Sequence, residues 1–165
     1  MADSWRTVRR NTIQIAEDIP EEKYGFQVTP ETMTVAQMLA HLAVSTDWVE
    51  QAHFVERASE ITGEQFHGWF GAIGKMSAEL STKAEILDAL QARGDSFAEH
   101  LDAMTDEQLQ EVVTLPGGSK TRFEMLLGAK EHEMHHRAQL MQIERMIGIV
   151  PHLTRARQAR AASAT

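Results

Sequence analysis

Four long segments of this chain carry apolar side chains at the spacing of one face of an α-helix. They cover about residues 3–18, 32 or 34 to 58, 81 or 82 to 104, and 121–147. Two of them begin at a threonine, Thr82 or Thr121, that precedes a glutamate by three residues, which is the pattern of a capping box. Pro20 follows the first segment, and Gly148 and Pro151 follow the last, as is typical of helix ends. The pattern predicts an all-α chain.

The connections between these segments differ in length. Residues 59–75 are rich in glycine and carry three aromatic side chains, so they are predicted to form a long crossover of the kind that covers a functional site. Residues 111–118 combine a β-branched run with Pro-Gly-Gly and predict a small hairpin. Four such helices with one long connection are expected to pack as an antiparallel four-helix bundle. We therefore predict a single bundle domain over residues 1–153, which is long enough to bury its own core.

The charge and the residue composition exclude several classes of function. A formal net charge of −8 argues against a nucleic-acid partner, which requires a basic face. The chain has no cysteine, so disulfides, thiolate catalysis and thiolate metal ligands are excluded. It has no signal-peptide pattern and no apolar run of about 20 residues, so we expect a cytoplasmic protein with no membrane partner. Residues 154–165 hold three arginines and no acid, and are predicted to be a flexible basic tail.

Two of the eight histidines are predicted to point into the bundle. His132 and His136 are four residues apart on one helix, so they project from the same face. The rest of that face is apolar or small, and consists of Met125, Ala129, Leu140, Ile143 and Ile147. Two buried imidazoles need polar partners, and they repel each other when both are protonated. A divalent ion such as zinc, nickel, copper or iron meets both requirements, since neutral imidazole nitrogens are good ligands for these metals.

A third histidine, His41, lies on the inward face of the second segment, together with Met38 and Trp48. A lone core histidine more often bonds another protein group than a metal. Here the pair of His132 and His136 lacks a third ligand, and metal sites in bundles are built from facing helices. We therefore predict that His41, His132 and His136 bind one divalent metal and leave a coordination position open for water or substrate.

The sequence leaves alternatives to this site open. Each inward ring could instead bond a side chain or carbonyl across the bundle, in a structural bundle without metal. His135 lies about one helical step off the inward face and is interpreted as a supporting or surface residue, although it could pair with His132 at a spacing of three. The run from His132 to His136 also matches the pattern of zinc peptidases, in which two histidines flank a glutamate. We discount that interpretation because it needs a third downstream ligand and a sheet.

Two runs of this sequence resemble the DinB/YfiT-like family of metal-dependent proteins, and the resemblance covers nearly the whole chain. Residues 132–140 are similar to the family's His-x-x-x-His-Arg-Gly-Gln signature, with Ala138 in place of the usual glycine. Residues 35–42 are similar to the family's second-helix segment, which ends at its first metal histidine. Residues 148–151 are similar to the family's end of the fourth helix.

The resemblance implies that the family's three metal histidines fall on His41, His132 and His136, in a DinB-like bundle that is often a homodimer. It implies a divalent metal such as zinc, nickel or manganese, and iron is also suited to imidazole ligands. Characterised relatives include thiol-dependent S-transferases that use mycothiol or bacillithiol, and a maleylpyruvate isomerase. In the S-transferases the metal would bind the sulfur of a low-molecular-weight thiol and lower its pKa.

The functional hypothesis is therefore a metal-dependent thiol S-transferase or hydrolase that acts on a small-molecule substrate. Glu133 and Asp47 are candidates for proton transfer, although Glu133 is expected to face solvent or to contact a group that supports the ligands. Arg137 and Gln139 are candidates for fixing the ligand helix or binding an anionic substrate. Arg137 could equally form a salt bridge with Glu133 or Glu144. The alternative function is a non-catalytic, stress-associated or structural protein in which the metal staples the bundle.

Overall fold

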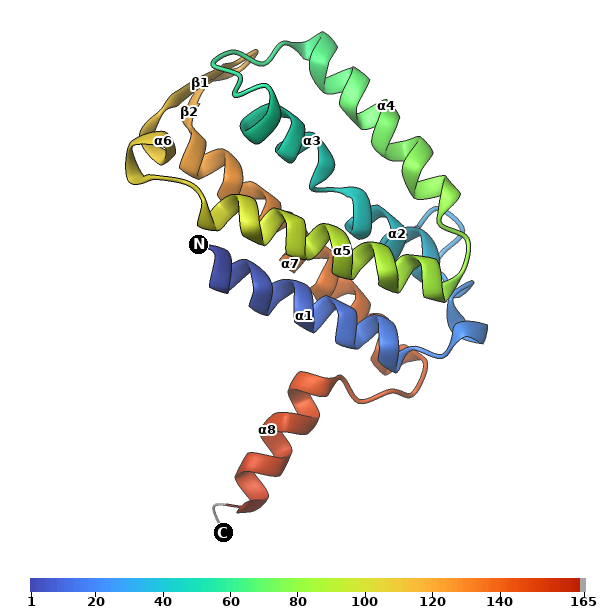
Figure 1. The fold of residues 1–165 in the computed structure, drawn as a ribbon. Coiled ribbons are helices and arrows are strands. Elements are labelled where there is room, and N and C mark those ends of the chain that lie inside the picture. Colours follow the sequence, from blue (N-terminus) through green and yellow to red (C-terminus); the bar gives the residue numbers. More distant parts are fainter. Residues whose placement is uncertain (164–165) are drawn as a thin grey trace.

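The computed structural model describes residues 1–163 and is mostly helical. Its centre is a bundle of α1 (Ala2–Asp18), α2 (Val35–Val44), α5 (Lys83–Asp102) and α7 (Arg122–Met146) (Figure 1). α1 packs against α5 and α7, and α2 packs against the same two helices, so α1 and α2 stand at opposite corners of the bundle. The predicted all-α four-helix bundle with a long crossover is therefore confirmed within the described residues.

Threonine capping boxes begin three of these helices. In each box the threonine hydroxyl accepts a hydrogen bond from the backbone N–H three residues later, and the side chain of that later residue accepts one from the threonine N–H. The pairs are Thr34 with Gln37, Thr82 with Glu85, and Thr121 with Glu124. These local interactions satisfy backbone donors that have no partner inside the helix, and they confirm the helix starts predicted from the sequence.

The bundle contains both antiparallel and parallel neighbours. The indole nitrogen of Trp5, near the start of α1, donates to the carbonyl of Gly94, well along α5, at 2.9 Å. The amine of Lys83, at the start of α5, donates to the carbonyl of Ile19, just after α1, at 2.7 Å. These two helices are therefore antiparallel, and α2 and α7 also run in opposite directions (Figure 1). α2 and α5 run in the same direction, because the crossover returns the chain to the end at which α2 began.

The second helical segment is broken. α2 ends at Val44 and is followed by a short helix α3 (Asp47–Glu50) and a π-helical turn η2 (Gln51–Val55). At the break the hydroxyl of Ser45 donates to the carbonyl of Leu42 at 3.1 Å, and so competes with the helical ladder for that acceptor. The prediction of one continuous helix through this segment is therefore wrong.

The glycine-rich crossover contains a helix, α4 (Gly63–Glu79), where the sequence predicts a connecting stretch between two helices. Thr62 begins this helix with another capping box, to Gln65. The apolar side chains of α4 repeat at helical spacing, and they are Phe66, Trp69, Phe70, Ile73 and Met76. The free energy gained by burying this face against α2 and α3 exceeds the helix-propensity cost of the glycines. Each glycine costs about 1 kcal/mol relative to alanine. Residues 63–75 of the predicted crossover therefore form part of a helix.

We expect Gly71→Ala to be more stable than the wild-type protein by about 0.5–1 kcal/mol. Gly71 is exposed on α4, and a Cβ at this position meets no atom within 4 Å, so alanine adds helix propensity without a clash. Thermal unfolding followed by circular dichroism measures the change. The matched comparison is Gly94→Ala in α5, where the new Cβ would lie 2.6 Å from Cγ of Arg9 and should destabilise the protein. Shifts of the same sign in both variants would contradict this account.

A short helix and a hairpin connect α5 to α7. The helix is α6 (Asp106–Gln110), and the strands are β1 (Val112–Leu115) and β2 (Gly118–Thr121). The strands are antiparallel, with Val112 opposite Thr121, so the predicted hairpin is confirmed. The connection after α1 includes the 3-10 turn η1 (Glu21–Lys23).

A last helix, α8 (His152–Ser163), begins beside α1 and projects away from that side of the bundle (Figure 1). Near its start the guanidinium of Arg155 pairs with the carboxylate of Asp18 at 2.6 Å. Residues 154–163 of the predicted basic tail are helical, while its flexibility stays a prediction. Residues 164 and 165 of the predicted tail lie outside the described part of the chain.

The core lies between the bundle helices and is completed by α4. Its largest fully buried side chains include Trp5, Ile15, Leu39, Leu90 and Phe97. Within residues 1–163, no helix combines the length and the apolar character that crossing a membrane requires. Buried side chains of α2 and α7 pack in the same core cluster, so these two helices face each other.

Candidate metal centre

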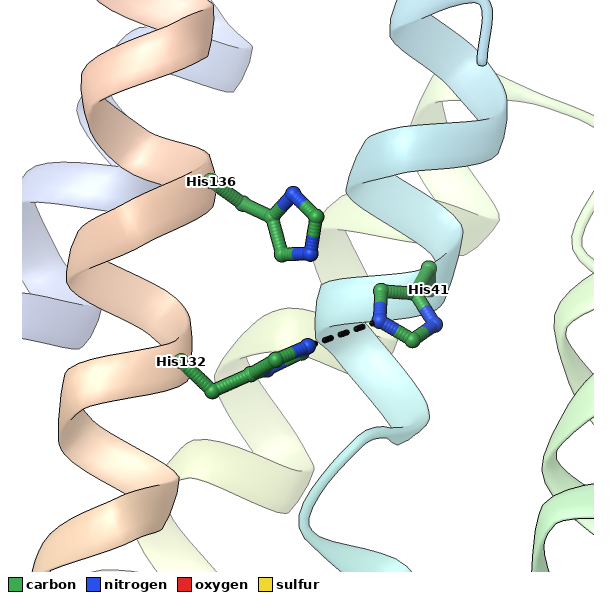
Figure 2. Close-up of side chains that lie close together, drawn as sticks. All are labelled: His41, His132 and His136. Atoms are coloured by element: carbon green, nitrogen blue, oxygen red, sulfur yellow. Dashed lines mark hydrogen bonds between the residues drawn. The ribbon is translucent and has the colours of Figure 1, made fainter. Parts of the chain in front are cut away.

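Three histidine side chains from two facing helices converge on one point (Figure 2). His132 and His136 lie one turn apart on α7, and His41 lies opposite them on α2. The Nε2 atoms of His41 and His132 are 3.0 Å apart, and each of the three residues offers a ring nitrogen within 4.8 Å of those of the other two. The structure thus brings together the same three residues that the sequence analysis selects, in a group that could hold a metal ion.

Burial favours the neutral form of all three rings. Desolvation is the main cause that lowers the pKa of His41, His132 and His136. For His132 the pKa falls to about 4, and the charges of the neighbouring imidazoles add to the effect of burial. A neutral imidazole keeps a lone pair on one nitrogen, which is the form in which histidine binds zinc, nickel, manganese or iron. The chemistry of the donor set therefore fits a divalent ion.

Gln139 orients the ring of His136. Its side-chain oxygen lies 2.8 Å from Nδ1 of His136, so Nδ1 carries the proton and donates, while Nε2 keeps its lone pair for a ligand. The amide nitrogen of Gln139 lies 3.3 Å from Nε2 of His135 and donates to it. His135 is exposed and is joined to the site through Gln139 rather than directed into the group of three. Gln139 is thus a supporting residue whose contact fixes one candidate ligand.

Within the described residues, three hollows border the histidine group. One, of about 190 Å³, borders His41 and His132 and is walled by Trp48, Phe70 and Ile73. Phe70 and Ile73 come from α4, so the crossover covers part of the site, as the sequence analysis expects, although it does so as a helix. A second hollow, of about 470 Å³, borders His136. A third, of about 580 Å³, borders His41. The sequence placed Trp48 on the face of His41 and Phe70 in the covering crossover, but the helical spacing that brings Ile73 to the same wall was hidden among glycines.

The proton-transfer candidates are engaged in ion pairs. Glu133 is fully buried, and its Oε2 lies 2.8 Å from Nη2 of Arg9 on α1. Asp47 pairs with the guanidinium of Arg93 on α5. Neither carboxylate belongs to the histidine group. Glu133 follows His132 directly, and a rotation of about 100° per residue directs it toward a different neighbouring helix.

Arg137 does not belong to the histidine group among the described residues. Its charge acts on His152 at the start of α8, whose pKa is lowered first by burial and then by Arg155 and Arg137. Within residues 1–163 it forms no ion pair with Glu133 or Glu144, which the sequence analysis considered as partners. The site as the structure describes it therefore consists of three histidines, Gln139 and apolar walls.

Comparison with known proteins places this arrangement in a family. The model of the DinB superfamily matches residues 4–140. The chain is similar to the DinB-like protein YjoA of Bacillus subtilis, with a TM-score of 0.68 and 19% identity over 89% of this chain and 90% of that one. A DinB-like protein of Bacillus cereus has a TM-score of 0.66 and 15% identity over 90% of this chain and 91% of that one.

YfiT of Bacillus subtilis, described as a probable metal-dependent hydrolase with an unusual four-helix bundle topology, is also similar. Its TM-score is 0.68, with 17% identity over 90% of this chain and 86% of that one. A search of curated proteins found no match. At these identities the solved structures establish the shared fold, while the family model covers most of the sequence. The chain therefore belongs to the DinB superfamily.

Proposed function

We propose that this protein is a metal-dependent enzyme in which His41, His132 and His136 bind one divalent ion beside the substrate. The observation that carries the proposal is the convergence of three neutral ring nitrogens at the edge of apolar hollows. Three protein ligands leave positions free for water or substrate, which is typical of catalytic rather than structural sites. Zinc, nickel, manganese and iron all suit this ligand set.

The bound ion would supply Lewis-acid chemistry, lowering the pKa of a water molecule or thiol so that it becomes a nucleophile near pH 7. With water the reaction is a hydrolysis, and with an external low-molecular-weight thiol it is an S-transfer. The chain has no cysteine, so the thiol would have to come from outside the protein. Gln139 holds one ligand ring in position, and Trp48 and Phe70 limit the access of water from one side. The description of YfiT as a metal-dependent hydrolase supports the hydrolytic form.

Metal content tests the proposal. We expect untagged protein, expressed without added metal, to contain about one divalent ion per chain by elemental analysis. The double variant His132→Ala/His136→Ala should contain none, because a single remaining histidine does not retain an ion through purification. His41→Ala should lose most of its metal as well, because it removes the ligand contributed by α2.

His67→Ala is the matched control, because His67 is exposed on α4 and lies outside the histidine group. It should keep the metal content of the wild-type protein. Circular dichroism checks that each variant is folded, so that lost metal reflects lost ligands. The proposal is wrong if wild-type protein stays free of metal after addition of zinc, nickel or manganese. It is also wrong if the site variants keep the metal.

A non-catalytic protein in which the metal staples the bundle gives a different result on chelation. A closed structural site couples metal binding to folding, so a chelator would lower the unfolding temperature strongly. In the enzyme, α2 and α7 are already held together by the buried core, and we expect a small change. Thermal unfolding with and without chelator therefore separates the two functions.

A further inference from the structure

The hollow beside His136 has apolar walls and a polar rim. It measures about 470 Å³. Its walls include Val28, Met33, Met38, Ile143 and Met146. Val28, Met33 and Met146 are 47%, 41% and 52% exposed, and large apolar side chains that gather in one exposed patch usually mark a binding surface. Methionine side chains are flexible and adapt to ligands of different shape.

Two glutamine side chains are among the polar residues that line this hollow, which also include Thr32 and Glu31. Gln139 and Gln142 line it together with His136, and their amides can donate and accept hydrogen bonds without carrying a charge. Since Gln139 already contacts His136, the polar edge of the hollow is also the edge nearest the candidate metal. A ligand seated there would point its polar end toward the histidines and its apolar body toward Met33 and Met146.

Cationic side chains are missing from the walls of the three hollows that border the histidine group, as far as the described residues form them. Carboxylates and phosphates are usually recognised by arginine or lysine. Here the charged side chain at the walls is Glu31, which borders two of the hollows. A remote anionic group on a substrate would therefore find no partner and would be repelled by Glu31.

We infer that the site takes an uncharged substrate with an apolar body, which rests in the hollow formed by Met33, Met38, Ile143 and Met146. This inference rests on the proposed function, because the metal at the histidines receives the reacting end of the substrate. The apolar body provides binding energy by burial, and Gln142 provides an uncharged hydrogen-bonding partner at the wall. The same geometry disfavours substrates that carry a carboxylate far from the reacting end.

A series of hydroxamates tests the inference, because a hydroxamate binds a divalent ion while its chain reports on the neighbouring surface. The probes are acetohydroxamate, octanohydroxamate and suberic acid monohydroxamate, which has the octanoyl chain with a carboxylate in place of the terminal methyl group. Affinities for the zinc-loaded full chain are measured by calorimetry. We expect octanohydroxamate to bind about 30-fold more tightly than acetohydroxamate, through partial burial of its methylenes. The carboxylate-terminated probe should lose about tenfold relative to octanohydroxamate.

Matched variants locate the chain of the ligand. Met146→Gln should reduce the advantage of octanohydroxamate about threefold and leave the affinity for acetohydroxamate unchanged. Met134→Gln is the control, because Met134 is 40% exposed on the same helix and does not line the hollow. Equal affinities for the short and long probes, or tightest binding of the carboxylate probe, would overturn the inference while leaving the metal site intact. Failure of acetohydroxamate and zinc to bind at all would instead overturn the proposed function, and this inference with it.

Discussion

Replacing Arg9 by methionine, or Glu133 by leucine, is expected to lower the free energy of unfolding by about 3–5 kcal/mol in either variant. The two side chains form a buried ion pair, with Arg9 3% exposed and Glu133 0% exposed. Nε and Nη2 of Arg9 lie 3.1 and 2.8 Å from Oε2 of Glu133. Removing one partner leaves the other as an uncompensated charge in the core, and that charge dominates the loss of stability.

The same guanidinium also holds the backbone of two other helices. Nη1 donates to the carbonyl of Leu90 on α5 at 3.2 Å, and Nη2 donates to the carbonyl of Leu42 on α2 at 3.1 Å. One side chain of α1 therefore contacts α2, α5 and α7. Leu42 directly follows His41, so this contact also fixes the backbone next to one of the candidate metal ligands.

The double variant Arg9→Met/Glu133→Leu separates charge from packing. Because it replaces both charges by apolar groups, it should be more stable than either single variant. Urea unfolding of the four proteins gives the coupling energy. Arg10→Met is the control, since Arg10 is the exposed neighbour of Arg9 on α1 and should change stability little. Simple addition of the two single effects would show that the ion pair is not the source of the loss.

Glu144→Met is expected to stabilise the protein increasingly as pH rises, with the gain over wild type growing by about 2 kcal/mol between pH 5 and pH 8. Glu144 is fully buried on α7, and neither oxygen of its carboxylate has a hydrogen-bond partner among the described residues. Burial, and then the charge of Asp18, raises the pKa of Glu144 from 4.5 to about 7. The attraction of Arg155 and Arg145 offsets only part of this effect.

The direction of the pH effect follows from the raised pKa. The folded protein holds the Glu144 proton more tightly than the unfolded chain, so this group favours folding fully below about pH 4.5. That contribution is lost as pH rises to about 7, because the buried carboxyl must then ionise without a hydrogen-bond donor. Methionine has a similar size and no charge, so the variant avoids this loss.

Urea unfolding of metal-free wild type and Glu144→Met at pH 5 and pH 8 measures the effect. The difference between the two proteins isolates the contribution of Glu144, because all other titratable groups are common to both. Glu131→Met, at an exposed position of the same helix, serves as the control and should show no comparable pH-dependent gain. A gain of equal size at both pH values would contradict the burial of an ionising carboxyl at this site.

The sequence by itself determined the features that depend on local periodicity. The helical spacing of apolar residues defined α1, α5 and α7, and Thr82 and Thr121 marked helix starts, because a capping box closes within three residues. His132 and His136 were assigned to one face because four residues on a helix amount to about one turn. Metal binding by these residues stays a prediction, while their convergence with His41 is a feature of the structure.

The tertiary structure decided the features that depend on distant partners. The glycines of α4 favour a loop when the segment is considered alone. Packing of its apolar face against α2 and α3 supplies the stabilisation that offsets the entropy cost of ordering the helix. Glu133 looked available for catalysis until Arg9, 124 residues away, was brought against it in the core. The wall of the hollow beside His136 likewise joins Met33 to Met146, which lie far apart in the sequence. Periodicity assigns a side chain to a face of its helix, but which charge or surface meets that face is set by how the helices pack.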